Sequence, residues 1–523
     1  MSSCSRVSDR ARCHVRKRRD RPRARAYTAP MELDARRCYS ALKARDARFD
    51  GRFFVAVSTT GIYCRPVCTA RTPGQDRCSF FANAASAERA GYRPCLRCRP
   101  ELAPGHAPTD AVRTAAHWAV ARIDAGALNE GDLERLAAEY GISSRQLRRV
   151  VETEFGVTPV ELAQTRRLLL AKHLLTDSAL GMTELAYASG FSSVRRFNHL
   201  FKSRYGLNPT ALRRKGQPVA LEDVITLKLA YRPPFDWTRL LAFLASRGAA
   251  GVECAAGRRY LRSASLEIAG RTHRGWFAAE PLPQQNALRL DISPLLMPAL
   301  APLLARVRRL FDLDANPRVI EEHLGRDARL RTIVRRQTGL RVPGAFDGFE
   351  LALRAVLGQQ ISVKAASTLF GRCAAAFGEP VSLAPAATRS ATMPDARLLF
   401  YAPTAERLAR ATLRELRAIG LTKKRAETIH ALARAITYAG LRLEPGVDVE
   451  ATMRSLQALP GIGAWTAHYI AMRALGYPDA YPHADLGLMK ALGLRKAGDM
   501  LAAAEPWRPW RSYAAHHLWA SLK

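Results

Sequence analysis

Two closely spaced pairs of cysteines constrain the fold of this chain more than any other feature of its sequence. Three residues separate Cys64 from Cys68, and two separate Cys95 from Cys98. Four soft sulfur ligands at these spacings fit one tetrahedral Zn²⁺ ion. We therefore predict that residues 31–105 fold as a small α+β domain around one zinc. On spacing alone, a closed structural zinc that only holds this domain together is the favoured interpretation.

An internal repeat constrains the segment that follows. Its matching pieces are residues 136–144 with 185–193, and residues 155–159 with 205–209. A doubled helix–glycine turn–helix unit of about 50 residues is too short for a solenoid and is typical of paired helix-turn-helix motifs. Gly141 and Gly190 suit the turns, where φ is often positive. The repeat predicts an all-α module over residues 106–216.

Polar residues after each turn of the repeat are candidates for reading DNA bases, because arginine and asparagine match the edges of guanine and adenine in the major groove. The candidates are Arg145, Arg148, Arg195, Arg196 and Asn198. For any one of them the alternative is contact with phosphate alone, or a place on a solvated face. The apolar residues expected in the core are Leu136, Leu147, Leu185, Phe197, Leu200 and Phe201.

The net charge favours a polyanionic partner. The chain has 81 Lys+Arg against 46 Asp+Glu, a formal charge of +35, and nucleic acid is the default partner for such an excess. A compositional bias toward arginine and alanine is the alternative explanation. No uninterrupted apolar run approaches about 18 residues, so we expect neither a membrane span nor a membrane partner.

The first 30 residues are predicted to form a separate arm. They hold ten Lys/Arg against two Asp/Glu without apolar periodicity, so residues 1–30 are expected to be disordered. Met31 is an alternative start to Met1. No apolar segment follows the basic residues, so no secretory signal is predicted and a cytoplasmic location is expected.

The C-terminal half divides into two parts. Residues 224–230 and 287–292 are typical of strands, and a helix is predicted at 237–247 between them, whereas the pattern beyond is helical nearly to the end. This predicts a small α/β domain at 217–300 and an all-α domain at 301–523. The whole chain is then expected to be a multidomain, mainly α protein.

The surroundings of the cysteines resemble a known family. The resemblance is carried by Thr59-Thr60-Gly61-Ile62-Tyr63-Cys64-Arg65-Pro66 and by Gly91-Tyr92-Arg93-Pro94-Cys95. Both runs are similar to the N-terminal domain of the Ada family of methyl-phosphotriester repair proteins. The resemblance implies that zinc-bound Cys64 accepts a methyl group from a DNA phosphotriester and is not regenerated. The repeat resembles the AraC-type DNA-binding module, which implies two recognition helices in successive major grooves, promoter sites, and RNA polymerase as a further partner.

Electrostatics fit a methyl acceptor. Zinc holds sulfur as thiolate, its reactive form, at neutral pH. Four thiolates around Zn²⁺ carry a charge of about −2, which repels DNA phosphates, and methylation of Cys64 removes one negative charge. Affinity for DNA should therefore rise after the transfer. Candidates for phosphate contacts near the zinc are Arg65, Arg71, Arg93 and Arg97.

Residues 218–523 resemble the AlkA-type 3-methyladenine DNA glycosylases of the helix-hairpin-helix superfamily. The resemblance is carried by residues 232–237, 346–350, 356–362 and 459–467. It implies a TATA-binding-protein-like fold for the α/β domain and hydrolysis of the N-glycosidic bond of alkylated purines. Gly461 and Gly463 would let the backbone approach a DNA phosphate at a helix N-terminus. The alternative for these glycines is an ordinary glycine-rich connection between two helices. The resemblance also implies a monovalent cation bound by carbonyl groups of the hairpin.

Asp485 occupies the place of the catalytic carboxylate of that family. An ionised carboxylate stabilises the oxocarbenium-like sugar of the transition state, and a cationic alkylated purine leaves without a strong general acid. Read locally, Asp485 is also a good helix N-cap, and Asp479 is the nearby rival carboxylate. Many members of the superfamily place a Schiff-base lysine where this chain has Trp465, so we predict a monofunctional enzyme that leaves an abasic site.

The target base must leave the helical stack to react. Trp465, Tyr469 and Trp519 match pocket positions of the AlkA type and are predicted to sandwich an electron-poor purine. The alternative for each ring is a place in the hydrophobic core. Gln360 matches the residue that wedges into the duplex, where related enzymes carry an apolar side chain.

Together these features predict an alkylation-damage repair protein that joins a zinc-thiolate sensor and regulator to a base-excision glycosylase, with double-stranded DNA as its partner. No Pro-Cys-His-Arg motif occurs, so repair of O6-alkylguanine is not expected. Two alternatives remain: a transcription regulator whose glycosylase half is inactive, and a glycosylase whose zinc domain is purely structural.

Overall fold

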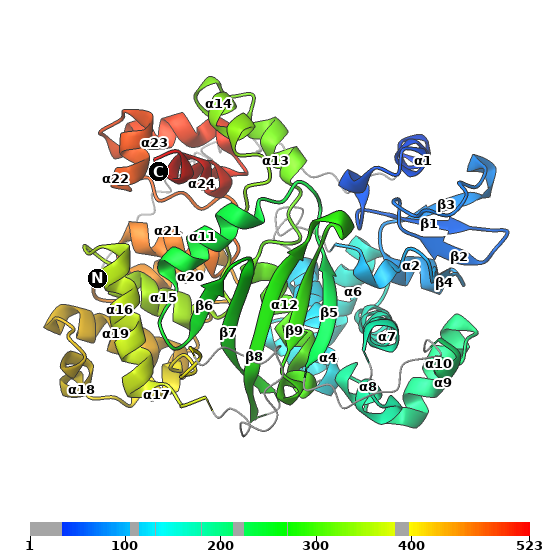
Figure 1. The fold of residues 1–523 in the computed structure, drawn as a ribbon, viewed down its shortest axis with the longest axis horizontal. Helices are drawn as coiled ribbons and strands as arrows, with labels where there is room; N and C mark the ends of the chain where they lie inside the picture. The colour runs from blue at the N-terminus through cyan, green and yellow to red at the C-terminus, as the bar shows by residue number, and fades with distance from the viewer. Residues whose placement is uncertain are drawn as a thin grey trace, which may run out of the picture. The chain divides into compact units, whose positions relative to one another are not determined.

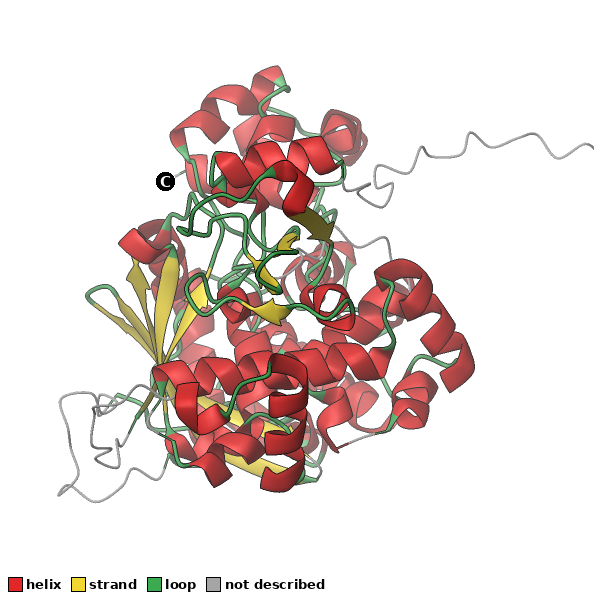
Figure 2. Ribbon diagram, turned by 90° about the vertical axis from the view of Figure 1, so that its right-hand side faces the viewer, coloured by secondary structure: helices red, strands yellow, loops and turns green. Residues whose placement is uncertain are grey.

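The computed structural model describes residues 34–104, 115–130, 132–178, 180–212, 224–268, 270–381 and 397–522. The predicted disordered arm at 1–30 lies outside them. Figure 1 shows the chain by residue number, and Figure 2 shows that helices make up most of the described part, with strands gathered in two sheets. This is the multidomain, mainly α architecture that the sequence predicts. Within the described ranges no helix is both long and apolar enough to cross a bilayer.

The cysteine-rich part is a small α+β unit. Its four-stranded sheet has the order β3-β1-β2-β4, in which β2 pairs antiparallel with β1 and parallel with β4. The apolar side chains of β1 are buried, which fixes the register of the sheet. The elements are α1 (Ala35–Lys43), β1 (Phe54–Val57), β2 (Ile62–Cys64), β3 (Cys78–Phe81), α2 (Ala84–Arg89) and β4 (Arg93–Pro94).

The internal repeat forms helices with matching turns. Gly141 and Gly190 adopt φ of +77° and +84°, as the turn interpretation requires. Five of the six predicted core residues are fully buried, and Leu200 packs partly buried against the core. The helices are α3 (Ala115–Asp124), α4 (Ala127–Glu130), α5 (Leu133–Glu139), α6 (Ser144–Phe155), α7 (Pro159–Asp177), α8 (Met182–Ala188), α9 (Val194–Tyr205) and α10 (Pro209–Leu212).

An antiparallel sheet of order β5-β9-β8-β7-β6 begins the C-terminal half. The predicted strands and helix are confirmed as β5, β9 and α11, whereas the sequence did not indicate β6, β7 and β8. The elements are β5 (Ile225–Ala230), α11 (Trp237–Arg247), β6 (Glu253–Ala256), β7 (Arg259–Ile268), β8 (Arg271–Leu282) and β9 (Ala287–Ile292).

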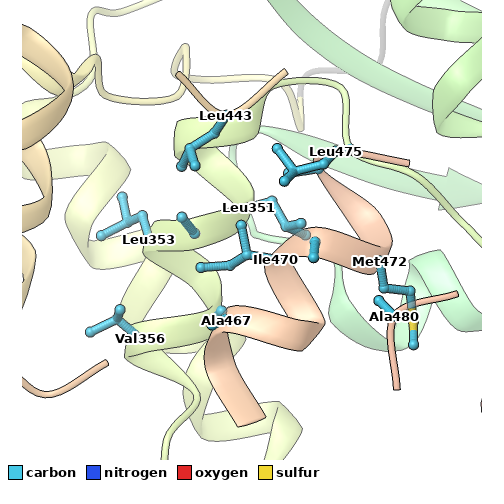
Figure 3. Close-up of a cluster of buried hydrophobic side chains, with 14 of the residues drawn as sticks. Leu351, Leu353, Val356, Leu443, Ala467, Ile470, Met472, Leu475 and Ala480 are labelled. Atoms are coloured by element: carbon cyan, nitrogen blue, oxygen red, sulfur yellow. The ribbon is translucent and has the colours of Figure 1, made fainter. Parts of the chain in front are cut away.

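The rest of the chain is helical. A buried cluster joins α15 to α21, where Leu351 and Val356 lie against Ala467 and Ile470 (Figure 3), and this packing fixes the start of α21. The helices are α12 (Leu300–Leu310), α13 (Pro317–Leu324), α14 (Ala328–Arg336), α15 (Gly348–Leu357), α16 (Val363–Phe377), α17 (Ala405–Ala409), α18 (Leu413–Ala418), α19 (Lys423–Tyr438), α20 (Val449–Gln457), α21 (Ala464–Arg473), α22 (Leu486–Leu492), α23 (Ala497–Ala504) and α24 (Arg511–Ser521).

A fully buried arginine joins the cysteine-rich unit to the C-terminal half. Arg232 follows β5 and has no exposed surface. Its guanidinium donates to the backbone carbonyls of Asp50, Pro104 and Asp314. Its own carbonyl accepts from Arg341. Because a guanidinium cannot shed its charge, these carbonyl acceptors are what make its burial tolerable.

A buried carboxyl group joins the cysteine-rich unit to the helical repeat. Glu88 of α2 accepts hydrogen bonds from the hydroxyls of Tyr63 at 2.9 Å, Thr165 at 2.9 Å and Tyr205 at 3.1 Å. These three donors come from β2, α7 and α9. Burial raises the pKa of Glu88 from 4.5 to about 7, although its hydrogen bonds act in the opposite direction.

We expect the stability of the protein to depend on the ionisation of Glu88. Because its folded-state pKa is raised, the stability it contributes is complete below about pH 4.5 and is lost as the pH rises to about 7. The loss amounts to about 3 kcal/mol. Thermal unfolding is measured for zinc-loaded wild type and Glu88→Gln in parallel. Between about pH 4.5 and pH 7, the stability of the variant should rise relative to that of wild type. A difference that does not change with pH would contradict this expectation.

Candidate functional site

A cleft of about 670 Å³ opens between the all-α part and α11. The predicted catalytic and pocket residues Asp485, Trp465, Tyr469 and Trp519 all line it. They come from α21, from the residue before α22 and from α24, so the fold brings together side chains that are distant in sequence. Helix α11 contributes Phe243 and other residues to the lining of the cleft. The site therefore draws on both the small sheet domain and the helical domain.

Both carboxylate oxygens of Asp485 accept hydrogen bonds. Oδ2 accepts from the indole N–H of Trp465 at 2.8 Å, and Oδ1 accepts from that of Trp519 at 2.9 Å. Oδ1 also accepts from the backbone N–H of Leu488 at 2.8 Å, which makes Asp485 the N-cap of α22. Charged acceptors form the stronger hydrogen bonds, so three donors hold this carboxylate in one orientation. The local N-cap interpretation and the place in the cleft are thus both correct.

The three aromatic rings are arranged differently from the sandwich that the sequence suggested. Trp465 and Tyr469, one turn apart on α21, stack directly on each other with centroids 5.2 Å apart and planes at 8°. A purine does not fit between rings this close, because each stacked layer needs about 3.5 Å. Trp519 meets Tyr469 at 6.5 Å, edge to face. The space for a base therefore lies beside this aromatic group rather than between Trp465 and Tyr469.

Two guanidinium groups flank the inner end of the aromatic group. Arg473 donates to the Tyr469 hydroxyl at 2.7 Å and to the carbonyls of Pro343 and Gly344. Burial raises the pKa of the Tyr469 hydroxyl, but the positive charges of Arg473 and Arg247 together lower it by more. The net pKa therefore lies below its usual range. The hydroxyl of Tyr469 is therefore held in place as an acceptor.

The rival carboxylate has a structural role. Asp479 is buried and receives two hydrogen bonds from Arg511, at 2.7 and 2.8 Å, and one from Arg508. Such a pair is costly to break, since either partner alone would be a buried, uncompensated charge. Asp479 does not line the cleft. Geometry thus favours Asp485 over Asp479 as the reactive carboxylate.

The hairpin of the predicted DNA contact lies between α20 and α21. Gly461 has φ of +81°, and a Cβ there would stand 2.2 Å from the hydroxyl of Thr428, so only glycine fits. Gly463 is exposed at the N-cap of α21, where free amides can meet a phosphate. Gln360 is exposed in the turn between α15 and α16, with φ of +56°. The predicted cation on hairpin carbonyls stays a prediction.

Sequence reasoning missed Gln359. Its side-chain amide donates to the carbonyl of Gly461 at 2.9 Å and to the hydroxyl of Thr466 at 3.1 Å. Its own carbonyl accepts from Arg425 on α19. The only sequence signal was its place beside Gln360 in the 356–362 motif, because the groups it binds lie about a hundred residues away.

The four cysteines gather at one point. Their sulfur atoms all lie within 4.8 Å of one another. Sulfur atoms about 2.3 Å from a tetrahedral Zn²⁺ stand about 3.8 Å apart, so the cluster fits this ion, and the chain has a zinc-binding site. The β2–β4 pairing brings the two cysteine pairs together, with the Cys95 amide donating to the Tyr63 carbonyl at 2.9 Å.

Arg65, one of the predicted phosphate contacts, instead binds groups within the protein. Arg65 is mostly buried, and its guanidinium forms a paired contact with Asp50 and donates to the Cys98 carbonyl at 3.1 Å. It therefore supports the metal site from inside, whereas Arg71 and Arg97 are exposed. On the helical repeat, all five predicted base-reading residues are exposed on α6 and α9: Arg145, Arg148, Arg195, Arg196 and Asn198.

Four family models match successive parts of the chain. The metal binding domain of Ada matches residues 37–101, and a helix-turn-helix domain matches 136–215. The AlkA N-terminal domain matches 226–347, and the HhH-GPD superfamily of base excision DNA repair proteins matches 353–499. The order of these models is the order of parts that the sequence predicts.

Whole-chain relatives exist among curated proteins. A Mycobacterium tuberculosis protein named probable bifunctional transcriptional activator/DNA repair enzyme AlkA is 39% identical over 506 residues, covering 94% of this chain and 97% of the relative. DNA-3-methyladenine glycosylase 2 of Escherichia coli is 37% identical over 291 residues, 56% of this chain and 95% of the relative. The Bacillus subtilis bifunctional transcriptional activator/DNA repair enzyme AdaA is 31% identical over 177 residues, 34% of this chain and 81% of the relative.

Proposed function

Because the chain belongs to the family of bifunctional transcriptional activator/DNA repair enzymes AlkA, we propose that it excises alkylated purines from double-stranded DNA and also senses and regulates the response to alkylation. The observation that carries the excision activity is the place of Asp485. Its carboxylate is held by two indole N–H groups in a cleft beside an aromatic group. This combination of fixed negative charge and aromatic surface is what removal of an electron-poor base requires.

The reaction follows from this geometry. An extruded nucleotide places its base beside the aromatic rings and its sugar near Asp485. As the N-glycosidic bond breaks, positive charge develops on the sugar, and the carboxylate stabilises it and orients the attacking water. N3- or N7-alkylated purines carry a positive charge and leave readily. Trp465 stands where a lysine would form a Schiff base, so the product is an abasic site in an intact strand.

Base release from methylated duplex DNA tests this function. The full-length wild type should liberate 3-methyladenine, detected by chromatography, and leave strands that break only after alkali treatment. Strand breaks without alkali would contradict the monofunctional mechanism. Absence of any released base would favour the alternative of a regulator with an inactive glycosylase half.

We expect Trp465→Phe to slow base release about tenfold or more. Phenylalanine keeps a ring that stacks on Tyr469 but removes the N–H that donates to Asp485, and hydrogen bonds to charged groups contribute about 1.5–3 kcal/mol. Single-turnover rates on one methylated duplex measure the effect. Trp276→Phe, on β8 and away from the cleft, should react at the wild-type rate. An unchanged rate in Trp465→Phe would show that the indole acts only by stacking.

We propose further that Cys64 accepts a methyl group, with Cys68, Cys95 and Cys98 as the other zinc ligands. Zinc supplies a thiolate that is reactive at neutral pH. Support comes from the convergence of the four sulfurs and from the match to the metal binding domain of Ada. The exposed arginines of α6 and α9 suit binding to promoter DNA. RNA polymerase as a partner and a cytoplasmic, nucleoid-associated location complete the proposal.

A further inference from the structure

The turn that carries Gln360 is held in an unusual conformation. Gln360 has φ of +56°, a left-handed backbone that residues with a side chain rarely adopt. Such strain persists only where the surrounding structure fixes it. Gln360 itself is exposed, and the nearby Gly358 and Ile361 line the cleft. The turn therefore needs support from its neighbours rather than from the Gln360 side chain.

That support comes from Gln359. Its amide N–H₂ group bridges the Gly461 carbonyl of the hairpin, at 2.9 Å, and the Thr466 hydroxyl of α21, at 3.1 Å. Arg425 of α19 donates to the Gln359 carbonyl and so holds the backbone of the turn from another side. The elements concerned, α15, α16, α19 and α21, gather in one region of the fold (Figure 1). One side chain thus ties the turn to the hairpin.

The hairpin has little freedom to shift. Gly461 leaves no room for a side chain because the Thr428 hydroxyl occupies that place, and Thr428 lies on the same helix as Arg425. Gly463 then starts α21, and Trp465, the donor to Asp485, follows two residues later. The phosphate-contacting hairpin and the catalytic carboxylate are therefore already connected through α21. Gln359 connects the turn between α15 and α16 that carries Gln360, here called the wedge turn, to the hairpin and α21.

We propose that Gln359 is a positioning residue for nucleotide extrusion. To extrude a nucleotide, the enzyme must hold the DNA backbone at one place while a side chain enters the duplex at another. The distance between the hairpin that contacts a phosphate and the wedge turn must therefore be fixed. The amide of Gln359 fixes it by bonding the wedge turn to the hairpin. Gln359 does not touch the reacting atoms. This inference rests on the proposed glycosylase function.

The test separates extrusion from chemistry. A single 7-methylguanine is placed in a duplex opposite cytosine, or opposite a tetrahydrofuran abasic analogue, which lowers the cost of extrusion. Single-turnover release by full-length wild type, Gln359→Met and Gln360→Ala is compared on both duplexes. We expect the release rate of Gln359→Met to fall about tenfold or more when the lesion is opposite cytosine. Opposite the analogue, its release rate should stay within about twofold of the wild-type rate. Gln360→Ala should show the same selectivity, and the double variant should lose less than the product of the two single losses.

A second variant covers the case in which Gln359→Met folds poorly. Thr466→Val removes one of the two acceptors and leaves the bond to Gly461, so a smaller loss confined to the cytosine duplex is expected. Equal losses on both duplexes, or no loss on either, would overturn the positioning role while leaving the glycosylase function intact. Failure of wild type to release the base from either duplex would overturn the proposed function and this inference with it.

Discussion

Asp485→Asn is expected to release alkylated purines about 10²–10³-fold more slowly than wild type. A preorganised charge aimed at the reacting centre contributes about 3–4 kcal/mol to transition-state stabilisation, and the substitution removes it. Asparagine is also a good N-cap, so the bond from the Leu488 amide to this side chain persists and the fold should not change. The measurement is single-turnover release of 3-methyladenine from methylated duplex DNA.

Asp347→Asn is the matched control. Asp347 lines the same cleft and caps α15 as Asp485 caps α22, but it pairs with Arg306 and lies away from the indole donors. It should retain nearly the full rate. If Asp485→Asn kept wild-type activity, Asp485 would be only a helix cap and the reaction would use another group.

Cys64→Ser is expected to abolish methyl transfer from DNA phosphotriesters while leaving base excision intact. In the proposed reaction the Cys64 sulfur forms a bond to the methyl carbon as the carbon–oxygen bond breaks, and the phosphodiester anion leaves. A serine hydroxyl is not ionised at neutral pH and cannot replace the thiolate. Mass spectrometry after exposure to methylated DNA should find one added methyl group on Cys64 of wild type and none on the variant.

The chain offers a matched thiol for this experiment. Cys78 lies on β3 of the same unit, is half-buried and stands outside the four-sulfur cluster. Cys78→Ser should still acquire one methyl group on Cys64. An unmodified Cys64 in wild type would establish the zinc as purely structural.

The order of domains and the zinc site could be predicted from sequence because short motifs carry them. Four cysteines at characteristic spacings have few other uses, and glycines at 461 and 463 mark a close backbone approach. The place of Asp485 in the cleft was harder to predict, because its sequence pattern fits an N-cap equally well. Only the fold shows that its second oxygen faces the Trp465 indole.

The features that could not be predicted from sequence depend on contacts between residues that are distant along the chain. Arg65 resembles a free phosphate contact until Asp50 is brought against it. The long strand β8 begins with polar, exposed residues and contains Pro281, so local propensity hides it, and pairing with β7 and β9 decides its structure. The Trp465–Tyr469 stack could not be predicted either, since spacing of one helical turn permits contact but does not fix ring orientation.

The buried Arg232 depends on acceptors from both sides of the junction between the cysteine-rich unit and the C-terminal half. A fragment that begins near residue 217 would keep this guanidinium but lose the carbonyls of Asp50 and Pro104 that accept from it. Water would take the place of these two acceptors in the fragment, and the Asp314 carbonyl would still accept from Arg232. An uncharged side chain at position 232 would therefore matter for the intact polypeptide, where it leaves the Asp50 and Pro104 carbonyls without this donor, and not for an excised glycosylase fragment.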